Sequence, residues 1–382
     1  MECVLFVESS KALVELCGLS IIERSLRTLQ ICGVTQAYIL ADNAPALIQH
    51  LREPSPQRAQ VACEFSEPPH DGKLRLLARG DSVFDPRLFQ WLLAHGNPAV
   101  LTDAGQFCGA ALATSSSAEA LRDEKLPQLD LTQHSWYIAG MRRTLRPYWF
   151  PAPNESEKKE AANLILNAAQ KGTLDIPALV HAPIETFIVS KLCKTAVTPN
   201  QLTVISNIVA WCATILFATG HLAAGIVVAL AVGVLDGLDG KQARVKLEMS
   251  KAGELEHFFD VLFENSWWIA IAWHLHASGK LPAALFYLAL LLVAEIVAGL
   301  ARGSIVRYFG KSISELGGFD RLVRLIGGRR NVYVWILAIG IAMGAPASAF
   351  KIVAWWEVAT AAVHWPRAIW ALNTRRRQSA RL

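Results

Sequence analysis

Residues 236–260 read DGLDGKQARVKLEMSKAGELEHFFD and place four carboxylates, Asp236, Asp239, Glu256 and Asp260, among long apolar runs. A charge at membrane depth costs about 2.5–3.5 kcal/mol, so carboxylates there usually face a polar cavity or a bound cation. The first two are three residues apart and the last two are four apart, so each pair shares one face of its own helix. Such oxygen ligands suit Mg²⁺, Mn²⁺ or Ca²⁺ rather than zinc. The stretch therefore predicts two facing helices whose carboxylates converge on a divalent cation.

Small and basic side chains follow the first carboxylate pair. Gly240 has no side chain and lets a ligand approach the backbone, and Ala243 keeps the next turn of the same face small. Arg244 offers a guanidinium fork for phosphate oxygens. The alternative interpretation is that the whole stretch is a solvated amphipathic loop and helix.

The stretch resembles the signature of the CDP-alcohol phosphatidyltransferase family, in which DxxDGxxAR is followed by GxxxDxxxD. The matching positions are Asp236, Asp239, Gly240, Ala243, Arg244 and Asp260. Two positions depart from the family pattern: Ala252 stands in place of glycine, and Glu256 in place of the third aspartate. Glutamate keeps the charge and reaches one methylene further.

The resemblance implies a metal-dependent enzyme that uses two ions, Mg²⁺ or Mn²⁺. The implied metal ligands are Asp236, Asp239, Glu256 and Asp260. The implied contacts to the CDP group are Asp236, Gly240, Ala243 and Arg244. Asp260 would also be the catalytic base on the acceptor hydroxyl. Homodimers are common in the family, so the resemblance implies a homodimer here.

The chain has 382 residues, which is enough for two domains. It is 53% hydrophobic with a net charge of +5, and its apolar runs fall after residue 200. A basic cluster ends it, formed by Arg375, Arg376, Arg377 and Arg381. This distribution favours a cytoplasmic membrane face over nucleic-acid binding. The seven cysteines lack CxxC spacing, which argues against a zinc site or a disulfide framework, and the start MECVLFVESS does not have the pattern of a cleavable signal peptide.

Residues 1–153 have the pattern of a soluble α/β domain. Val4–Val7 is a short apolar run typical of a strand, Leu19–Cys32 has helical periodicity, and Ala37–Leu40 predicts a second strand. Alternating units of this kind favour a Rossmann-like sheet flanked by helices.

The run that begins at Ser9, SSKALVELCGLSIIERSLRTLQICGVTQAYIL, resembles the start of sugar-phosphate nucleotidyltransferases. In that family a glycine-rich loop precedes the lysine, whereas here only Glu8, Ser9 and Ser10 separate the strand from Lys11. Few backbone N–H groups remain to bind a triphosphate. RGDSVFDPRLF resembles the metal-binding strand end of the same family, with Asp81 in the aspartate position; the alternative is an ordinary surface turn. We expect a degenerate nucleotidyltransferase-like domain that serves assembly, regulation or binding.

Residues 154–197 are expected to link this domain to a membrane domain at 198–373, which a basic cytoplasmic tail at 374–382 follows. Within the linker, Ile176–Lys194 suits an amphipathic helix at the membrane interface, with a buried soluble helix as the alternative. TPNQLT, residues 198–203, has the proline and hydroxyl of a helix start and resembles the segment before the first membrane helix of the same transferase family. Six apolar runs approach the length of about 20 residues that crosses a bilayer, namely 201–219, 221–238, 254–276, 281–301, 331–348 and 350–372.

The second and third runs carry the carboxylates at one end, so the active site should open at one membrane surface. Basic residues flank that surface, which predicts that it faces the cytoplasm. We expect an integral protein of the inner (cytoplasmic) membrane whose active site and soluble domain both face the cytoplasm. Arg302, Arg329 and Arg330 lie at or beyond the ends of later runs and are candidates to bind an acceptor phosphate. Anchoring to lipid headgroups is the alternative.

The order of parts is similar to that of bifunctional enzymes that make CDP-inositol from inositol phosphate and then di-myo-inositol phosphate phosphate. The chemistry that the resemblance implies is transfer of a phosphoalcohol or phosphatidyl group from a CDP-linked donor to an acceptor hydroxyl, with release of CMP. The acceptor could be a polyol, a polyol phosphate or a lipid. Two alternatives stay open: a non-catalytic membrane scaffold, and a bifunctional enzyme whose first domain makes the CDP-alcohol with Lys11 and Asp81.

Overall fold

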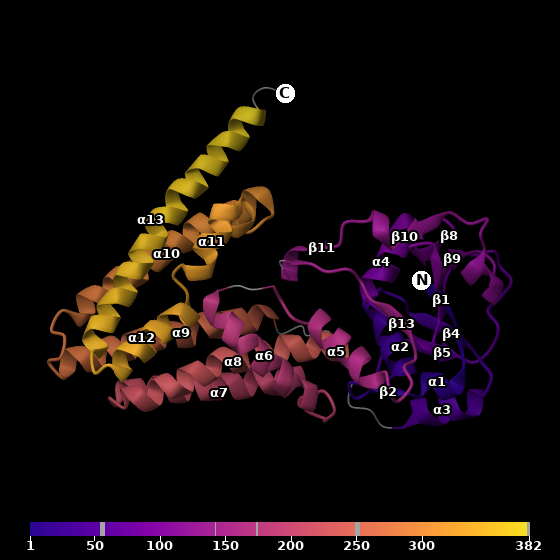
Figure 1. The fold of residues 1–382 in the computed structure, drawn as a ribbon, viewed down its shortest axis with the longest axis horizontal. Coiled ribbons are helices and arrows are strands. Elements are labelled where there is room, and N and C mark those ends of the chain that lie inside the picture. The colour runs from indigo at the N-terminus through magenta and orange to yellow at the C-terminus, as the bar shows by residue number, and fades with distance from the viewer. Residues whose placement is uncertain (54–57, 142, 173–174, 249–252, 380–382) are drawn as a thin grey trace. The chain divides into compact units, whose positions relative to one another are not determined.

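The computed structural model describes residues 1–53, 58–141, 143–172, 175–248 and 253–379, without the side chains of residues 253–258 and 375–379. Its contacts divide the chain into two compact units (Figure 1). Unit 1 comprises Met1–Lys171, Ile188–Pro199 and Gly240–Ser250. Unit 2 comprises Gly172–Phe187, Asn200–Asp239 and Lys251–Leu382. Residues 240–248 therefore pack with unit 1, which the sequence did not indicate.

Unit 1 is built on a mixed sheet with the strand order β10-β8-β9-β6-β1-β4-β5. The sheet strands are β1 (Glu2–Val7), β4 (Gln36–Ala41), β5 (Ala62–Glu64), β6 (Arg75–Arg79), β8 (Ala99–Asp103), β9 (Gln106–Ala113) and β10 (Gln128–Asp130). β1 runs parallel to β4 and β6, and β9 runs antiparallel to β6 and β8. Shorter strands pair outside this sheet: β2 (Glu15–Leu16), β3 (Leu19–Ser20), β7 (Ser82–Phe84), β11 (Tyr137–Ile138), β12 (Arg143–Thr144) and β13 (Trp149–Pro151). The predicted strands are β1 and β4, so the α/β class is confirmed.

Two hydrophobic cores cover the two faces of this sheet. Because side chains alternate along a strand, Cys3 and Leu5 of β1 face one core while Val4 faces the other. The unit 1 helices are α1 (Ser9–Ala12), α2 (Ile21–Ile31), α3 (Ala44–Arg52), α4 (Pro86–His95) and α5 (Lys158–Ala168). α2 begins where the Ser20 hydroxyl accepts a hydrogen bond from the Glu23 amide, 3.3 Å away.

Unit 2 is helical, as predicted. Its main helices are α6 (Ile176–Leu192), α7 (Pro199–Ala218), α8 (Leu222–Lys246), α9 (Gly253–Ala277), α10 (Ala284–Phe309), α11 (Gly318–Ile326), α12 (Arg330–Ala342) and α13 (Pro346–Ser379). The C-terminal part of α6 and the end of α8 belong to unit 1. α13 is the long yellow helix of Figure 1 and packs along α10 and α12.

The six predicted apolar runs each contain a long helix, but the fifth differs from its prediction. The run at 331–348 was expected to be continuous, whereas α12 ends at Ala342 and Gly344, with φ +72°, turns the chain into α13. α13 in turn continues to Ser379, through the region expected to be a tail. The side chains of the C-terminal arginine cluster lie outside the described residues.

Within the described residues, α7, α8 and α10 are long and apolar enough to cross a bilayer, and the pair α11 and α12, bent by 43°, would make a fourth span. The predicted number of six crossings stays a prediction. Unit 2 also has an inverted polarity, because large apolar side chains face outward while charged ones are buried. Phe187 of α6 is 65% exposed, whereas His181 and Glu185 of the same helix are buried. This arrangement fits a membrane protein whose polar groups line the interior.

Candidate active site

The two carboxylates of α8 are held differently. Asp239 is buried, and its Oδ2 accepts a hydrogen bond of 2.6 Å from the Thr203 hydroxyl of α7, in the TPNQLT motif. Asp236 lies one turn earlier and forms an ion pair with Arg330 at the start of α12. The Arg330 guanidinium also lies over the Phe263 ring of α9, 5.1 Å from its centroid. The motif on α8 is therefore connected to α7 by a hydrogen bond and to α12 by an ion pair.

Glycines on α8 allow α6 to approach the motif closely. A Cβ atom at Gly237 would lie 2.5 Å from Glu185 Oε1, and one at Gly233 would lie 2.8 Å from His181 Cε1. These two polar side chains of α6 therefore cover glycines beside Asp236. The inward direction of both side chains depends on how α6 packs, so no local pattern in the sequence indicates it.

A polar cavity of about 540 Å³ lies within unit 2. Its charged and polar lining residues are Asp175, Asp236, Asp260, Glu264, Glu295, Arg302, Arg329, Arg330, Asn331, Tyr333 and Glu357. Five helices, α8, α9, α10, α12 and α13, contribute to this set. Such a concentration of charge among apolar helices is costly unless a polar ligand or ion uses it. The predicted carboxylates Asp236 and Asp260 thus share one cavity with the three predicted arginines.

Of the remaining signature carboxylates, only Asp239 has a described side chain, and it is not in that lining. Asp239 makes the contact with Thr203, and the Glu256 side chain lies outside the described residues, although its backbone belongs to α9. Ala252 also lies outside them.

Several residues of the cavity were missed from the sequence. Glu264 follows Asp260 by four residues on α9, so a regular helical spacing could have found it. Glu295, Tyr333 and Glu357 come from three other helices and form no local pattern. The Tyr333 hydroxyl donates a hydrogen bond to Glu357 Oε2, and both side chains are buried.

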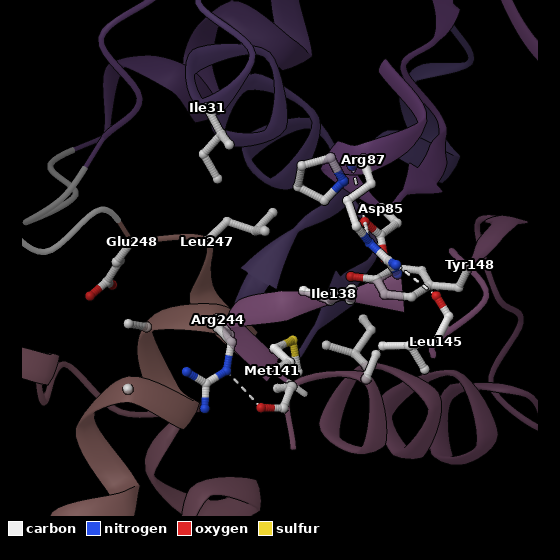
Figure 2. A pocket seen from close by; sticks show the side chains of 16 residues that line it. Ile31, Asp85, Arg87, Ile138, Met141, Leu145, Tyr148, Arg244, Leu247 and Glu248 are labelled. Atoms are coloured by element: carbon white, nitrogen blue, oxygen red, sulfur yellow. Dashed lines mark hydrogen bonds and ion pairs between the residues drawn. The ribbon is translucent and has the colours of Figure 1, made fainter. Parts of the chain in front are cut away.

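Gly240, Ala243 and Arg244, the other predicted CDP contacts, line a different pocket of about 360 Å³ within unit 1 (Figure 2). Arg244 Nε donates a hydrogen bond of 2.7 Å to the Ala169 carbonyl at the end of α5. The opposite wall holds Asp85 and Arg87, which pair with each other at 2.5 Å. Most of the remaining lining is apolar, from Ile31, Ile138, Met141, Leu145, Ile165 and Leu247.

The first-domain candidates lie at the same edge of the sheet, because β1 and β6 are parallel neighbours. Lys11 is exposed and forms an ion pair of 2.7 Å with Glu8. Asp81 is 1% exposed, and its carboxylate receives two hydrogen bonds from Arg79, at 2.9 and 2.7 Å. α1 begins directly after β1, so the short segment at 8–10 forms a helical turn instead of a phosphate-binding loop. Both candidates thus contact residues within three positions of themselves.

The described carboxylates have the chemistry that a hard divalent cation requires. Asp236 and Asp260 bring oxygen donors from two helices to one cavity, which fits Mg²⁺ or Mn²⁺. Among the side chains that the structure describes, no group of three or more potential ligands lies close enough together to hold an ion. Asp236 has Arg330 as its counter-charge in this arrangement.

Comparisons with known proteins identify the class of the second half. Residues 196–363 match the CDP-alcohol phosphatidyltransferase family. The chain is also similar to curated proteins named bifunctional IPC transferase and DIPP synthase. The protein of Rubrobacter xylanophilus is 25% identical over 258 residues, which are 65% of this chain and 55% of the relative. The protein of Thermococcus kodakarensis is 27% identical over 195 residues, which are 49% and 42% of the two chains.

A third relative, from Archaeoglobus fulgidus, has the same name and is 32% identical over 159 residues, which are 38% of this chain and 31% of the relative. The chain thus spans about half the length, or less, of the curated relatives it matches.

Proposed function

We propose that this chain, which by its residues 196–363 is a CDP-alcohol phosphotransferase and a membrane enzyme, transfers a phosphoalcohol or phosphatidyl group to an acceptor hydroxyl and releases CMP. The observation that carries the proposal is the cavity in unit 2, where Asp236 and Asp260 meet Arg302, Arg329 and Arg330. Carboxylates can hold cations and take a proton, while arginines can hold phosphate. Together they supply the groups that phosphoryl transfer requires.

The reaction makes one phosphorus–oxygen bond and breaks another. The acceptor hydroxyl oxygen forms a bond to the phosphorus that carries the donor alcohol, and the bond from this phosphorus to the bridging oxygen of the diphosphate breaks. CMP leaves with the electron pair of that bond. Asp260 takes the hydroxyl proton, because its carboxylate lines the cavity where the acceptor would lie.

Mg²⁺ or Mn²⁺, two ions in our proposal, would neutralise the diphosphate and the charge that develops on CMP. Asp236, Asp239, Glu256 and Asp260 are the proposed ligands. Arg330 must then exchange the Asp236 carboxylate for another anion, and a phosphate in the same cavity is the natural partner.

The arginines favour an acceptor that itself carries phosphate, such as a polyol phosphate or a phospholipid. Arg302 comes from α10, while Arg329 and Arg330 come from the start of α12, so phosphate would be held between two helices. A plain polyol would leave this positive charge without an anion from the substrate. We further propose that the cavity opens at the cytoplasmic face of the inner membrane and that the enzyme acts as a homodimer.

The test is CMP release by the purified chain in detergent with Mg²⁺ or Mn²⁺. The donors are CDP-diacylglycerol and CDP-inositol, and the acceptors are polyols, polyol phosphates and phospholipids. Release that requires metal and is lost in Asp260→Asn would support the transferase and name its donor. A folded protein that binds metal and donor but releases CMP with none of these pairs would contradict the proposal and favour the scaffold.

A further inference from the structure

The end of α8 is buried inside unit 1. Val245 and Gln242 have no exposed surface, and Lys241 has 1%. This segment includes Gly240, Ala243 and Arg244, the half of the signature that we expect to contact the donor. In Figure 2, Arg244 and Leu247 lie on one wall of the unit 1 pocket, with Ile31 of α2 on another.

Two buried arginines of α2 bind the last carbonyls of α8. Arg24 Nη1 donates to the Val245 carbonyl at 2.9 Å, and Arg27 Nη1 donates to the Lys246 carbonyl at 2.8 Å. Arg27 Nη1 also lies 3.3 Å from Glu248 Oε1. The last carbonyls of a helix have no partner within the helix and carry the negative end of its dipole, so guanidinium groups are well suited to them. We call Arg24 and Arg27 the arginine clamp.

Other parts of unit 1 accept hydrogen bonds from side chains of the same segment. Gln242 Nε2 donates to the Val197 carbonyl at 2.5 Å, and Lys246 Nζ donates to the Thr195 carbonyl at 2.7 Å. Both carbonyls belong to the linker that precedes α7. Together with the contact between Arg244 and Ala169, these bonds fix the helix end in rotation as well as in position.

The partners of Arg24 indicate what the arginine clamp is for. Arg24 is 1% exposed, and its two described hydrogen bonds go to carbonyls, those of Val245 and Leu16. Its Nε has no hydrogen-bond partner among the described residues. A buried guanidinium satisfied in this incomplete way costs free energy, so it adds little stability and instead specifies one arrangement of the segments that it joins.

We propose that Arg24 and Arg27 are positioning residues for the donor site: they hold Gly240–Arg244 in the orientation that receives the CDP group. The inference rests on the proposed function. It gives the first domain a role in the reaction that needs no chemistry of its own. The degenerate nucleotidyltransferase-like fold serves, in this view, as the holder of the signature helix.

The experiment compares Arg24→Gln, Arg27→Gln and Arg24→Lys with Arg75→Gln in the purified full chain. Arg75 is a matched control, because it is 1% exposed and pairs with Glu2 and Asp71, away from α8. We expect kcat/KM for the CDP donor to fall about tenfold in each glutamine variant of the clamp, mainly through KM, since a hydrogen bond from a charged group is lost. KM for the acceptor should stay unchanged, and Arg24→Lys should recover most of the loss.

A second measurement separates this inference from the proposed function. Amide hydrogen exchange at 241–248 should accelerate in Arg24→Gln and Arg27→Gln but not in Arg75→Gln. Unchanged exchange and an unchanged donor KM in the clamp variants would overturn the inference, and so would equal losses in Arg75→Gln. Absence of CMP release from the unmodified chain would instead contradict the proposed function, while the exchange data would still test the clamp.

Discussion

The strand ends of unit 1 and the cavity of unit 2 both collect charged side chains, but they pair them over different sequence distances. In unit 1, the charges after β1, β6 and β7 pair locally: Lys11 with Glu8, Arg79 with Asp81, and Arg87 with Asp85, all within three positions, whereas Asp103 at the end of β8 pairs with Arg146, 43 positions away. In unit 2, Arg330 pairs with Asp236, 94 positions away. An ion pair between near neighbours forms whenever the local backbone folds.

An ion pair between distant residues requires tertiary structure, because several helices must be packed together before the charges can meet. The cavity of unit 2 keeps acids and bases from five helices in one place, where a ligand can replace the pairing that they now make. We therefore expect changes of charge in the cavity of unit 2 to alter catalysis, and equivalent changes at the strand ends of unit 1 to alter at most stability.

Of the changes that test this comparison, metal removal should reduce CMP release the most. Chelation with EDTA is expected to abolish CMP release, because the proposed ligands Asp236, Asp239, Glu256 and Asp260 would be left without the cations that neutralise the diphosphate. Excess Mg²⁺ or Mn²⁺ should restore release in the same sample. CMP release that persists in EDTA would contradict the proposed requirement for a divalent cation.

The second largest loss of CMP release is expected from Asp260→Asn, which keeps the shape of the side chain and removes the proposed base. CMP release should fall about a thousandfold, within the range that general bases contribute. Asp320→Asn is the control, because Asp320 is a buried carboxylate of unit 2 that pairs with Arg367 and does not line the cavity. Equal activity in the two variants would contradict the assignment of Asp260.

Arg330→Gln should weaken binding of the acceptor. With a phosphate-bearing acceptor, KM is expected to rise about 10- to 100-fold, because a charge-assisted hydrogen bond to phosphate is lost. Arg321→Gln, at an exposed position of α11, should leave KM unchanged. If Arg330→Gln lowered kcat without changing KM, the guanidinium would act on the reacting groups instead of holding the acceptor.

The smallest effects are expected at the first-domain candidates. Lys11→Ala should leave CMP release unchanged within about twofold, since an exposed ion pair contributes at most about 1 kcal/mol to stability. Asp81→Asn should lower the free energy of unfolding of unit 1, because it removes the charge of a buried carboxylate that pairs with the partly exposed Arg79, and should also leave CMP release unchanged.

The same two variants test the bifunctional alternative. CTP consumption in the presence of a polyol phosphate should be absent from the unmodified chain. Its presence there, and its loss in Lys11→Ala or Asp81→Asn, would show that the strand end of unit 1 is catalytic and that the comparison between the two regions fails.

The sequence was a good guide wherever one helix or strand carries the whole pattern. The short apolar run Val4–Val7 predicted β1, and the proline of TPNQLT predicted the start of α7 at Pro199. The spacing of acids on α8 and α9 identified Asp236 and Asp260, which do line one cavity. Arg302, Arg329 and Arg330 were singled out by their positions at the ends of apolar runs, and they line the same cavity.

What the sequence did not predict depends on packing between distant segments. The contact between Arg24 and Val245 joins residues 221 positions apart, and neither has a neighbour that reveals it. Tyr333 and Glu357 meet only because α12 packs on α13. The break between α12 and α13 was predicted after residue 348, a few residues too late, because the apolar run continues past Gly344, where the backbone turns.

The discontinuity of unit 1 has a consequence for how the protein is made. Its third segment, Gly240–Ser250, follows α7 and most of α8 in the chain. Translation delivers the N-terminal part first, and domains usually fold in that order. Here the sheet can form early, but the carbonyls that Arg24 and Arg27 bind are synthesised only after α7 and most of α8. Unit 1 therefore cannot complete its fold until the end of α8 has been synthesised.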